Sequence, residues 1–415
     1  MSRRAVFVCC DGLGAAWVRP DKTPVLEALK RRAAWCEDHS GVFPSVTRVS
    51  AASIATGCQP ARHGLQGNRM GLLEEGRIVV RDVGAPDFRT HLRRATGGTL
   101  RTPTLAERTA GIGGCIAYSN VSPGAAYFLD PDNHGHVHHR NGSFAPGGDS
   151  VEALDVTHDA AGDWTMTERF CAEVLEDRKP SVALLWLCDP DHTLHGVPLG
   201  SPDHDAALRG AERCVEAVVR TVDRLRASGE DILLMVGSDH GHETIGDVID
   251  VEAWLSDNGL ADLVASRDVA VAGQGTSALL YATAAGRERL EGALDAVARA
   301  PWAGEVLTGA ALAAAGFAAE GGVVAAVDMA RDPTPNSFGV AGRRWVAYEG
   351  KPVPVGSGQH GGRGPDETRP FLLVDDGRGA GRVARPTSLV DIAPTVARHL
   401  GLGLDGFDGR PLDRA

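Results

Sequence analysis

The sequence lacks several features that would assign it to a particular class of protein. No apolar run reaches the roughly 18 residues of a membrane-spanning helix, so we expect no membrane span. Basic residues are not in excess either: 42 Lys and Arg stand against 54 Asp and Glu, for a net charge of −12. Binding to a nucleic-acid polymer is therefore not expected. A compact phosphorylated substrate is still compatible with this charge, because a metal ion supplies local positive charge.

Cysteine motifs and an export signal are also missing. The eight cysteines form no C-x-x-C pair of the kind found in zinc ribbons and thioredoxin-like sites, so we expect reduced thiols that are mostly buried. The start, MSRRAVFVCCDGLG, has two arginines and a short apolar stretch, but no small-residue cleavage site precedes Asp11. We interpret this stretch as a buried strand and expect a cytoplasmic location.

Four short apolar runs alternate with helical patterns. Residues 5–10, 182–188, 232–236 and 371–374 are continuous apolar runs, which are typical of strands covered on both faces. Residues 205–226 repeat apolar side chains every three or four positions, which predicts an amphipathic helix. Further helices are expected from Pro24 to about Trp35 and from Ser388 to Leu400. The predicted fold is α/β, with a mostly parallel central sheet and helices on both faces.

The composition changes after about residue 245. Residues 261–345 are rich in Ala, Gly and Val and contain few strongly catalytic side chains. We therefore predict a catalytic core formed by residues 1–245 and 355–415, with a cap inserted at 246–354. Such a cap would govern the choice of substrate.

Carboxylate and imidazole side chains follow three of the predicted strands and recur near residue 360. In a mostly parallel sheet, the loops beyond the carboxyl ends of the strands meet at one crevice. Carboxylates and neutral imidazoles are the ligands of zinc and manganese, so these groups suit a site for two divalent cations. The candidate ligands are Asp11, Asp191, His195, Asp239, His240 and His360.

Thr47 begins a predicted short helix of small residues that Gly57 ends. A hydroxyl at a helix N-terminus lies beside free amides and the positive end of the helix dipole, which attract a phosphoryl group. With a metal ion at its oxygen, Thr47 could ionise near neutral pH and attack phosphorus. Taken alone, a threonine in this position is more often a helix cap than a nucleophile.

Five motifs together resemble the type I nucleotide pyrophosphatase/phosphodiesterase branch of the alkaline phosphatase superfamily, which also includes phosphonoacetate hydrolase. They are DGLG at 11–14, PSVTRVSAASIATGCQPARHGLQGN at 44–68, DPDHTLHG at 189–196, SDHG at 238–241 and GQHGG at 358–362. The resemblance implies one zinc ion held by Asp191, His195 and His360. It implies a second held by Asp11, Asp239 and His240, with the Thr47 oxygen as both nucleophile and ligand.

The resemblance also implies a reaction. Asn68 matches the asparagine that holds a nonbridging phosphoryl oxygen. An in-line displacement would form a phospho-threonine intermediate, which is then hydrolysed. The expected substrate is a small phosphate diester or nucleotide pyrophosphate.

Phosphonates and phosphate monoesters are alternative substrates. Phosphonoacetate hydrolases hold the substrate carboxylate with cap lysines, and this chain has only Lys22, Lys30, Lys179 and Lys351. Arginine also grips carboxylates, so the scarcity of lysine weakens this alternative without removing it. A phosphomonoesterase would need an arginine that the sequence does not reveal.

Two further alternatives are disfavoured. Cys58-Gln59-Pro60-Ala61-Arg62 spells the sulfatase signature C-x-P-x-R, but the cysteine follows Thr56-Gly57, whereas in sulfatases it precedes such a pair by nine residues. Thr47 occupies that earlier position. A scaffold protein that has lost activity would be expected to lack a ligand or the nucleophile, and neither is missing here.

Other polar residues compete for a role near the site. Asp189 and His192 could replace Asp191 and His195, although the family spacing favours the latter pair. His242 and Glu243 could orient His240 or lie exposed. A group of histidines is interpreted as a polar loop or cleft rim rather than a metal site; it comprises His134, His136, His138 and His139.

Overall fold

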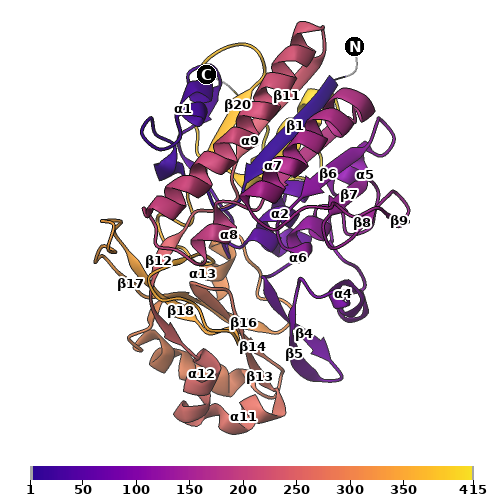
Figure 1. The fold of residues 1–415 in the computed structure, drawn as a ribbon. Coiled ribbons are helices and arrows are strands. Elements are labelled where there is room, and N and C mark those ends of the chain that lie inside the picture. Colours follow the sequence, from indigo (N-terminus) through magenta and orange to yellow (C-terminus); the bar gives the residue numbers. More distant parts are fainter. Residues whose placement is uncertain (1–2, 414–415) are drawn as a thin grey trace.

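A ten-stranded sheet runs through the upper part of the molecule in the computed structural model, which describes residues 3–413 (Figure 1). Its five central strands are parallel neighbours: β11 (Asp231–Gly237), β1 (Arg3–Cys10), β10 (Val182–Leu187), β6 (Cys115–Ser119) and β7 (His136–His139). β20 (Leu372–Asp375), β2 (Ala34–Cys36) and β21 (Gly381–Val383) extend it beyond β11. β8 (Ser143–Phe144) and β9 (Ser150–Val151) extend it beyond β7.

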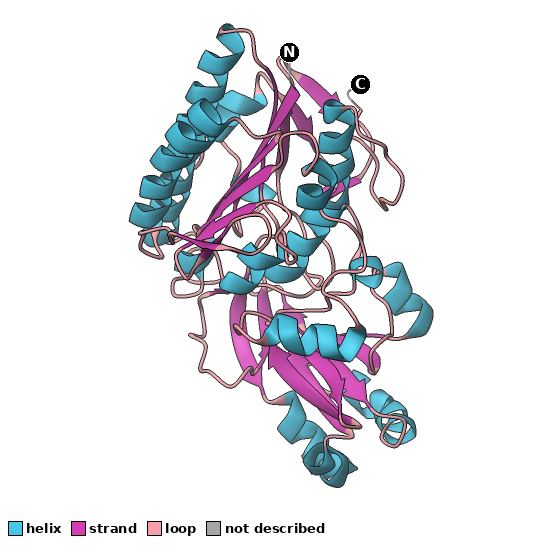
Figure 2. Ribbon diagram, turned by 90° about the vertical axis from the view of Figure 1, so that its right-hand side faces the viewer, coloured by secondary structure: helices cyan, strands magenta, loops and turns pink. Residues whose placement is uncertain are grey.

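Helices cover both faces of this sheet (Figure 2). α7 (Ala160–Arg169), its π-helical continuation η2 (Phe170–Arg178) and α9 (Pro202–Ala227) pack on one face, and α2 (Thr47–Thr56) and α14 (Ile392–Leu400) pack on the other. The side chains of β1 alternate accordingly, with Val8 on the α9 side and Phe7 on the α2 side. The predicted α/β fold with helices on both faces is confirmed.

Two predicted elements differ from the structure. The apolar run at 371–374 forms β20, which is antiparallel to β11, so Asp375 pairs with Leu234 in the middle of β11 and points away from the end that carries Asp239. The helix predicted from Pro24 ends earlier, as α1 (Pro24–Lys30). Residues Ala34–Cys36 instead form β2, because the backbone groups there pair with β20 and β21.

A four-stranded antiparallel sheet lies below the large one in Figure 1, within residues 246–354. Its order is β13 (Val269–Gly273), β14 (Ser277–Ala282), β16 (Val323–Met329) and β15 (Ala303–Leu307). Helices α10 (Val251–Leu255), η3 (Ser256–Leu260), α11 (Ala261–Ser266), α12 (Arg287–Ala298) and α13 (Gly309–Ala314) accompany it. The hairpin of β4 (Arg69–Glu74) and β5 (Arg77–Asp82) contacts β13, although it precedes residue 246.

A second small sheet lies where this segment leaves the large sheet and returns. It comprises β17 (Arg331–Asp332), β18 (Arg343–Ala347), β12 (Glu243–Ile249) and β19 (Gly358–Gln359). Glu243 pairs with Gln359 and Thr244 with Gly358, so the outgoing and returning chains lie side by side.

Short elements complete the described chain. The helices are η1 (Ala15–Trp17), α3 (Pro60–His63), α4 (Phe88–Thr96), α5 (Leu105–Thr109), α6 (Pro123–Phe128), α8 (Asp191–Leu194) and η4 (Leu389–Asp391). β3 (His39–Ser40) and β22 (Thr387–Ser388) form a separate parallel pair.

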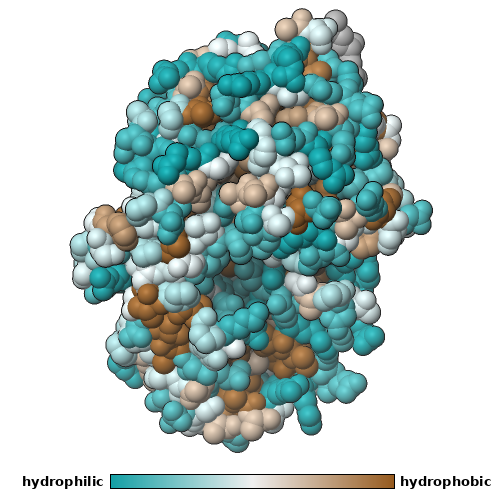
Figure 3. Space-filling view, in the orientation of Figure 1, coloured by the Kyte–Doolittle hydropathy of each residue, from teal (hydrophilic) through white to brown (hydrophobic). Residues whose placement is uncertain are grey.

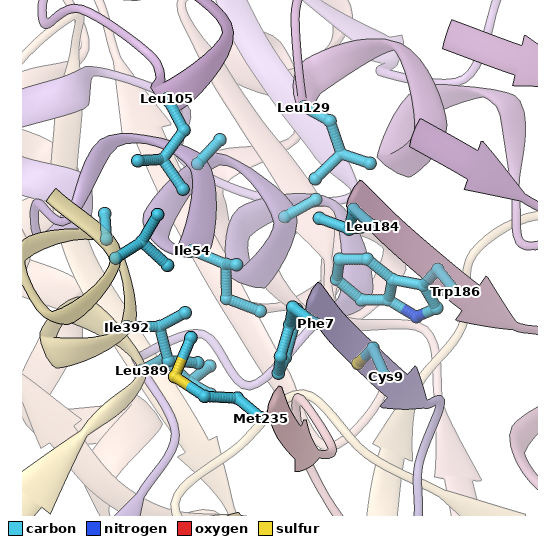
Figure 4. Packing of buried hydrophobic residues seen from close by; sticks show 14 of the residues in the cluster. Phe7, Cys9, Ile54, Leu105, Leu129, Leu184, Trp186, Met235, Leu389 and Ile392 are labelled. Carbon is cyan, nitrogen blue, oxygen red and sulfur yellow. The ribbon is translucent and has the colours of Figure 1, made fainter. Parts of the chain in front are cut away.

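Helix α2 is buried along almost its whole length, and this fixes the position of Thr47 at its start. Figure 4 shows Ile54 directed toward Phe7 of β1, with Leu389 and Ile392 close by. Small residues elsewhere on the helix let it lie close to the sheet. Gly57 ends the helix at a φ of 66°, and a Cβ there would lie 2.5 Å from the Phe407 ring.

The surface is mostly hydrophilic over the upper part of the molecule, where α9 turns its polar side outward (Figure 3). Among residues 3–413, no helix is both long enough and apolar enough to cross a membrane. All eight cysteines lie in this range, and none of them is in a disulfide.

Candidate dinuclear metal site

The carboxyl ends of β1, β10 and β11 bring three acidic groups together at one edge of the large sheet. Asp11 follows β1, Asp191 begins α8 shortly after β10, and Asp239 follows β11. The Asp191 amide donates to the Asp11 carbonyl oxygen over 3.0 Å, and the Gly12 amide donates to Asp239 Oδ1 over 3.1 Å. These backbone bonds tie the three loops into one framework.

Four side chains form the first group of donors: Asp191, His195, His242 and His360. Asp191 Oδ1 lies 3.3 Å from Nε2 of His195, 2.9 Å from Nε2 of His242 and 3.3 Å from Nε2 of His360. The His195 side chain is 39% exposed, whereas those of His242 and His360 are 1% and 4% exposed. One carboxylate oxygen therefore faces three imidazole nitrogens.

The second group consists of Asp11, Asp239 and His240, all buried. His240 Nε2 lies 3.4 Å from Asp11 Oδ1 and 3.2 Å from Asp239 Oδ2. Thr47 Oγ1 lies 3.2 Å from the same nitrogen. The His240 ring stacks on His360 with centroids 3.6 Å apart, so the two donor groups are direct neighbours.

Backbone carbonyls orient three of the histidines. Nδ1 of His240, His242 and His360 lies 3.1, 3.1 and 2.8 Å from the carbonyl oxygens of Gly241, Gly12 and Ser45. A carbonyl oxygen only accepts, so Nδ1 carries the proton. In the neutral ring, Nε2 then presents its lone pair to the carboxylates, which is the arrangement of a histidine that binds a metal ion.

Several buried atoms of these two groups have no hydrogen-bond partner within residues 3–413. They are Asp11 Oδ1, Asp191 Oδ1, Asp239 Oδ2 and His242 Nε2. Each unpaired buried group costs about 1–3 kcal/mol, and charged groups cost more. Burial, Asp239 and Asp191 together raise the pKa of Asp11 well above its usual value, and burial raises the pKa of Asp239 to about 7.

Two divalent cations would remove these penalties, because they would bind the unpaired atoms and favour ionised carboxylates. The donor types also match, since carboxylate oxygen and imidazole nitrogen suit zinc and manganese. The residues present therefore fit two metal ions. The six candidate ligands predicted from sequence all lie in these two groups, and His242 is an additional member.

Asn68 lies beside the first turn of α2. Its Oδ1 accepts from the Arg48 amide over 3.3 Å, which leaves the Nδ2 donor for a ligand. The backbone N–H of Asn68 donates to Gln274 Oε1 over 2.6 Å, and Gln274 Nε2 donates to the backbone carbonyl oxygen of Arg69 over 2.6 Å. Sequence reasoning missed Gln274. The one feature of the neighbouring sequence that relates to this contact is Gly67, because a Cβ there would lie 2.4 Å from Gln274 Oε1.

The competing polar residues lie elsewhere. Asp189 Oδ1 accepts from both the amide and the hydroxyl of Thr193, and His192 is exposed with its ring 4.1 Å from that of His158. Glu243 is buried and pairs with Arg331 over 3.1 Å. Among residues 3–413, the histidines at 134–139 belong to neither donor group, and three of them lie on strand β7 of the large sheet and not in a loop.

Residues 5–302 match the model of a family described as type I phosphodiesterase/nucleotide pyrophosphatase. The chain belongs to this family. Its members are hydrolases of phosphodiester and pyrophosphate bonds, as the motifs predicted. No curated protein matches the chain significantly.

Solved structures with the same fold include family members and a phosphonate hydrolase. Murine ectonucleotide pyrophosphatase/phosphodiesterase 5, as an inactive variant in complex with AMP, superposes with a TM-score of 0.70 at 15% identity, over 98% of this chain and 97% of that one. Human ectonucleotide pyrophosphatase/phosphodiesterase 5 gives 0.68 at 14% identity, over 98% and 97%. Phosphonoacetate hydrolase from Sinorhizobium meliloti 1021, in complex with phosphonoacetate, gives 0.65 at 17% identity, over 96% of each chain.

Proposed function

We propose that this chain is a two-metal-dependent hydrolase of phosphate diesters or nucleotide pyrophosphates that uses Thr47 as its nucleophile. The observation that carries the proposal is the position of Thr47 Oγ1, 3.2 Å from His240 Nε2 at the start of a buried helix. Thr47 is not the cap of this helix, because Val46 occupies the N-cap position, and the Thr47 hydroxyl faces His240 instead.

The proposed ligands of one ion are Asp191, His195 and His360, and those of the other are Asp11, Asp239, His240 and Thr47. When bound, such cations lower the pKa of a coordinated hydroxyl and neutralise charge on the phosphoryl oxygens. The Trp186 indole donates to Asp11 Oδ2 over 3.0 Å, which leaves Oδ1 directed at the donor group. The identity of the metal is not fixed by these donors, which suit zinc and manganese alike.

The remaining steps belong to side chains of this chain. The Thr47 hydroxyl releases its proton to solvent, and its oxygen bonds to phosphorus as the ester oxygen departs from the opposite side and takes up a proton from solvent. Asn68 Nδ2 donates to a nonbridging phosphoryl oxygen, and the positive end of the α2 helix dipole favours the same negative charge. Water then breaks the bond between the Thr47 oxygen and phosphorus, which regenerates the hydroxyl.

Residues 246–354 are proposed to act as the cap that selects the substrate. Gln274 from this segment holds the backbone on both sides of the Asn68–Arg69 peptide, which supports the assignment. A phosphonate is the alternative substrate. The fold is shared with a phosphonoacetate hydrolase, but Lys351 is the sole lysine of the segment and it is exposed.

A substrate panel tests the proposal. Bis(p-nitrophenyl) phosphate, p-nitrophenyl phosphate, a dinucleotide pyrophosphate and phosphonoacetate are assayed with and without chelator. We expect the diester or the pyrophosphate to be turned over fastest, and chelator to abolish the activity. Preferred turnover of phosphonoacetate would replace the substrate assignment, and full activity without metal would contradict the mechanism.

The nucleophile is tested with Thr47→Ala, which should lower kcat by at least about a thousandfold while both metal ions stay bound. Thr56→Ala is the matched control, because Thr56 ends the same helix and its hydroxyl donates to the Ala52 carbonyl oxygen. That variant should keep near wild-type activity. Retained turnover in Thr47→Ala would exclude Thr47 as the nucleophile.

A further inference from the structure

The first donor group contains one imidazole more than the family motif implies. His242 lies just after the SDHG motif, and its Nε2 is closer to Asp191 Oδ1, at 2.9 Å, than that of His195 or His360, each at 3.3 Å. We propose that His242 and His360 are the fixed imidazole ligands of the ion at Asp191, and that His195 is an exchangeable one. This inference rests on the proposed two-metal function and refines it.

The contact between His242 Nε2 and Asp191 Oδ1 is close but does not have the geometry of a hydrogen bond. Neither His242 Nε2 nor Asp191 Oδ1 has a hydrogen-bond partner within residues 3–413, although the two atoms lie 2.9 Å apart. His242 Nδ1 already uses its proton on the Gly12 carbonyl oxygen. A lone pair and a carboxylate oxygen at this distance repel each other unless a cation lies against both.

The His242 ring is held by a site built for it. A Cβ at Gly12, which has a φ of 70°, would lie 2.4 Å from His242 Cε1. A Cβ at Gly358 would lie 3.1 Å from His242 Cδ2. Glycine at both positions therefore makes room for the ring, which has a side-chain exposure of 1%. His242 cannot leave the donor group without repacking its surroundings.

His195 is held much less firmly. Its side chain is 39% exposed, and within residues 3–413 the structure gives its Nδ1 no hydrogen-bond partner. It lies at the end of α8, which is only four residues long. Catalytic metal sites typically combine three protein ligands with one position for water or substrate. Asp191, His242 and His360 supply the three fixed ligands here, and His195 can give its position to a substrate oxygen.

Cobalt binding tests this assignment independently of turnover. Chelator-treated protein is titrated with Co²⁺, bound metal is counted by elemental analysis, and the visible absorption is recorded at saturation. Wild-type protein should bind two ions. His242→Ala should weaken one of them by more than about 100-fold and change the absorption at saturation, because a nitrogen donor is lost. His195→Ala should weaken it by no more than about tenfold.

The controls separate ligation from folding. His399→Ala removes an imidazole near the opposite end of β11, 3.9 Å from Asp231, and should leave both the stoichiometry and the absorption unchanged. His242→Asn and His195→Asn are second variants of similar polarity, and thermal unfolding of each metal-free variant reports on its folding.

Two results would overturn the assignment. One is a His242→Ala protein that binds both ions with wild-type affinity and absorption. The other is loss of an ion in His195→Ala but not in His242→Ala. If either result is found and the wild-type protein binds two ions, only the assignment of His242 and His195 fails and the proposed function stands. A wild-type protein that binds none would overturn the proposed function and this assignment together.

Discussion

At the scale of single residues, Gln274 links the predicted cap to the predicted catalytic asparagine. Gln274→Ala would leave the Asn68 amide and the Arg69 carbonyl oxygen without their partners. A small shift of a group that contacts the phosphoryl oxygens can cost about 100-fold in rate. We therefore expect kcat to fall by about 10-fold to 100-fold, with a smaller change in KM and two metal ions still bound.

The matched control is Gln66→Ala. Gln66 also reaches residues 246–354, accepting from the Tyr281 hydroxyl and donating to the Glu320 carbonyl oxygen. These hydrogen bonds do not involve Asn68 or Arg69, so its removal should affect stability more than kcat. Equal losses of kcat in the two variants would show that Gln274 acts through general packing and not by positioning Asn68.

Sequence reasoning located the candidate ligands better than it located their neighbours. Asp11 and Asp239 directly follow strands, and the carboxyl ends of parallel strands meet, so their proximity followed from the predicted fold. His242 lies in a loop with no periodic pattern, so the sequence did not indicate which of the two donor groups it would join. Gln274 was missed for a similar reason, since it reaches Asn68 from the loop between β13 and β14, far away in the sequence.

At the scale of secondary-structure elements, the pair formed by β3 and β22 contains a buried histidine. His39 Nδ1 lies 2.9 Å from Thr387 Oγ1, Nε2 has no hydrogen-bond partner within residues 3–413, and burial lowers the pKa of His39 to about 4. In an unfolded chain the value is about 6.5. Protonation therefore favours the unfolded state, so this contribution to stability is complete above pH 6.5 and is lost as the pH falls toward 4.

His39→Asn should remove that pH dependence. Between pH 7.5 and 4.5 the wild-type free energy of unfolding should fall by about 2–3 kcal/mol more than that of the variant. Urea unfolding of chelator-treated protein at both pH values measures the difference, because metal release then does not contribute. The exposed His192→Asn variant should track the wild type. Parallel losses in wild type and His39→Asn would contradict the assignment.

The direction of β20 shows what periodicity cannot predict. An apolar run at 371–374 has the same appearance whether the strand is parallel or antiparallel to β11, because burial on both faces is the same in either case. The end of α1 was missed for a related reason. No glycine or proline separates Lys30 from β2, and the strand exists because β20 and β21 pair with it.

At the scale of the whole molecule, Arg344 joins the two parts of the chain. Its buried guanidinium pairs with Asp328 on β16, in the inserted segment. It also lies 3.4 Å from Glu367 Oε1 and 3.7 Å from Glu243 Oε2, and both of these residues belong to the predicted core. Removing one member of a buried ionic network leaves the remaining charges uncompensated, at a cost of about 3–5 kcal/mol.

Arg344→Ala should therefore lower the free energy of unfolding by about 3–5 kcal/mol, as measured by urea or thermal unfolding. Arg343→Ala is the adjacent control, because Arg343 is exposed and its guanidinium donates to the Pro335 carbonyl oxygen over 3.1 Å. That change should cost less than about 1 kcal/mol. Similar losses in the two variants would show that the buried network is not what holds the parts together.

The pairing of β12 with β19 makes the geometry of the metal site independent of the length of the inserted segment. Glu243, next to His242, pairs with Gln359, next to His360, so the two strands are held together before the chain departs and after it comes back. Adding or deleting residues between β12 and β19 changes the loop-closure entropy only weakly with length, and the pairing of the two strands keeps the distance between His242 and His360 unchanged. Related proteins could therefore acquire new substrates through changes in the inserted segment while the metal-binding residues stay the same.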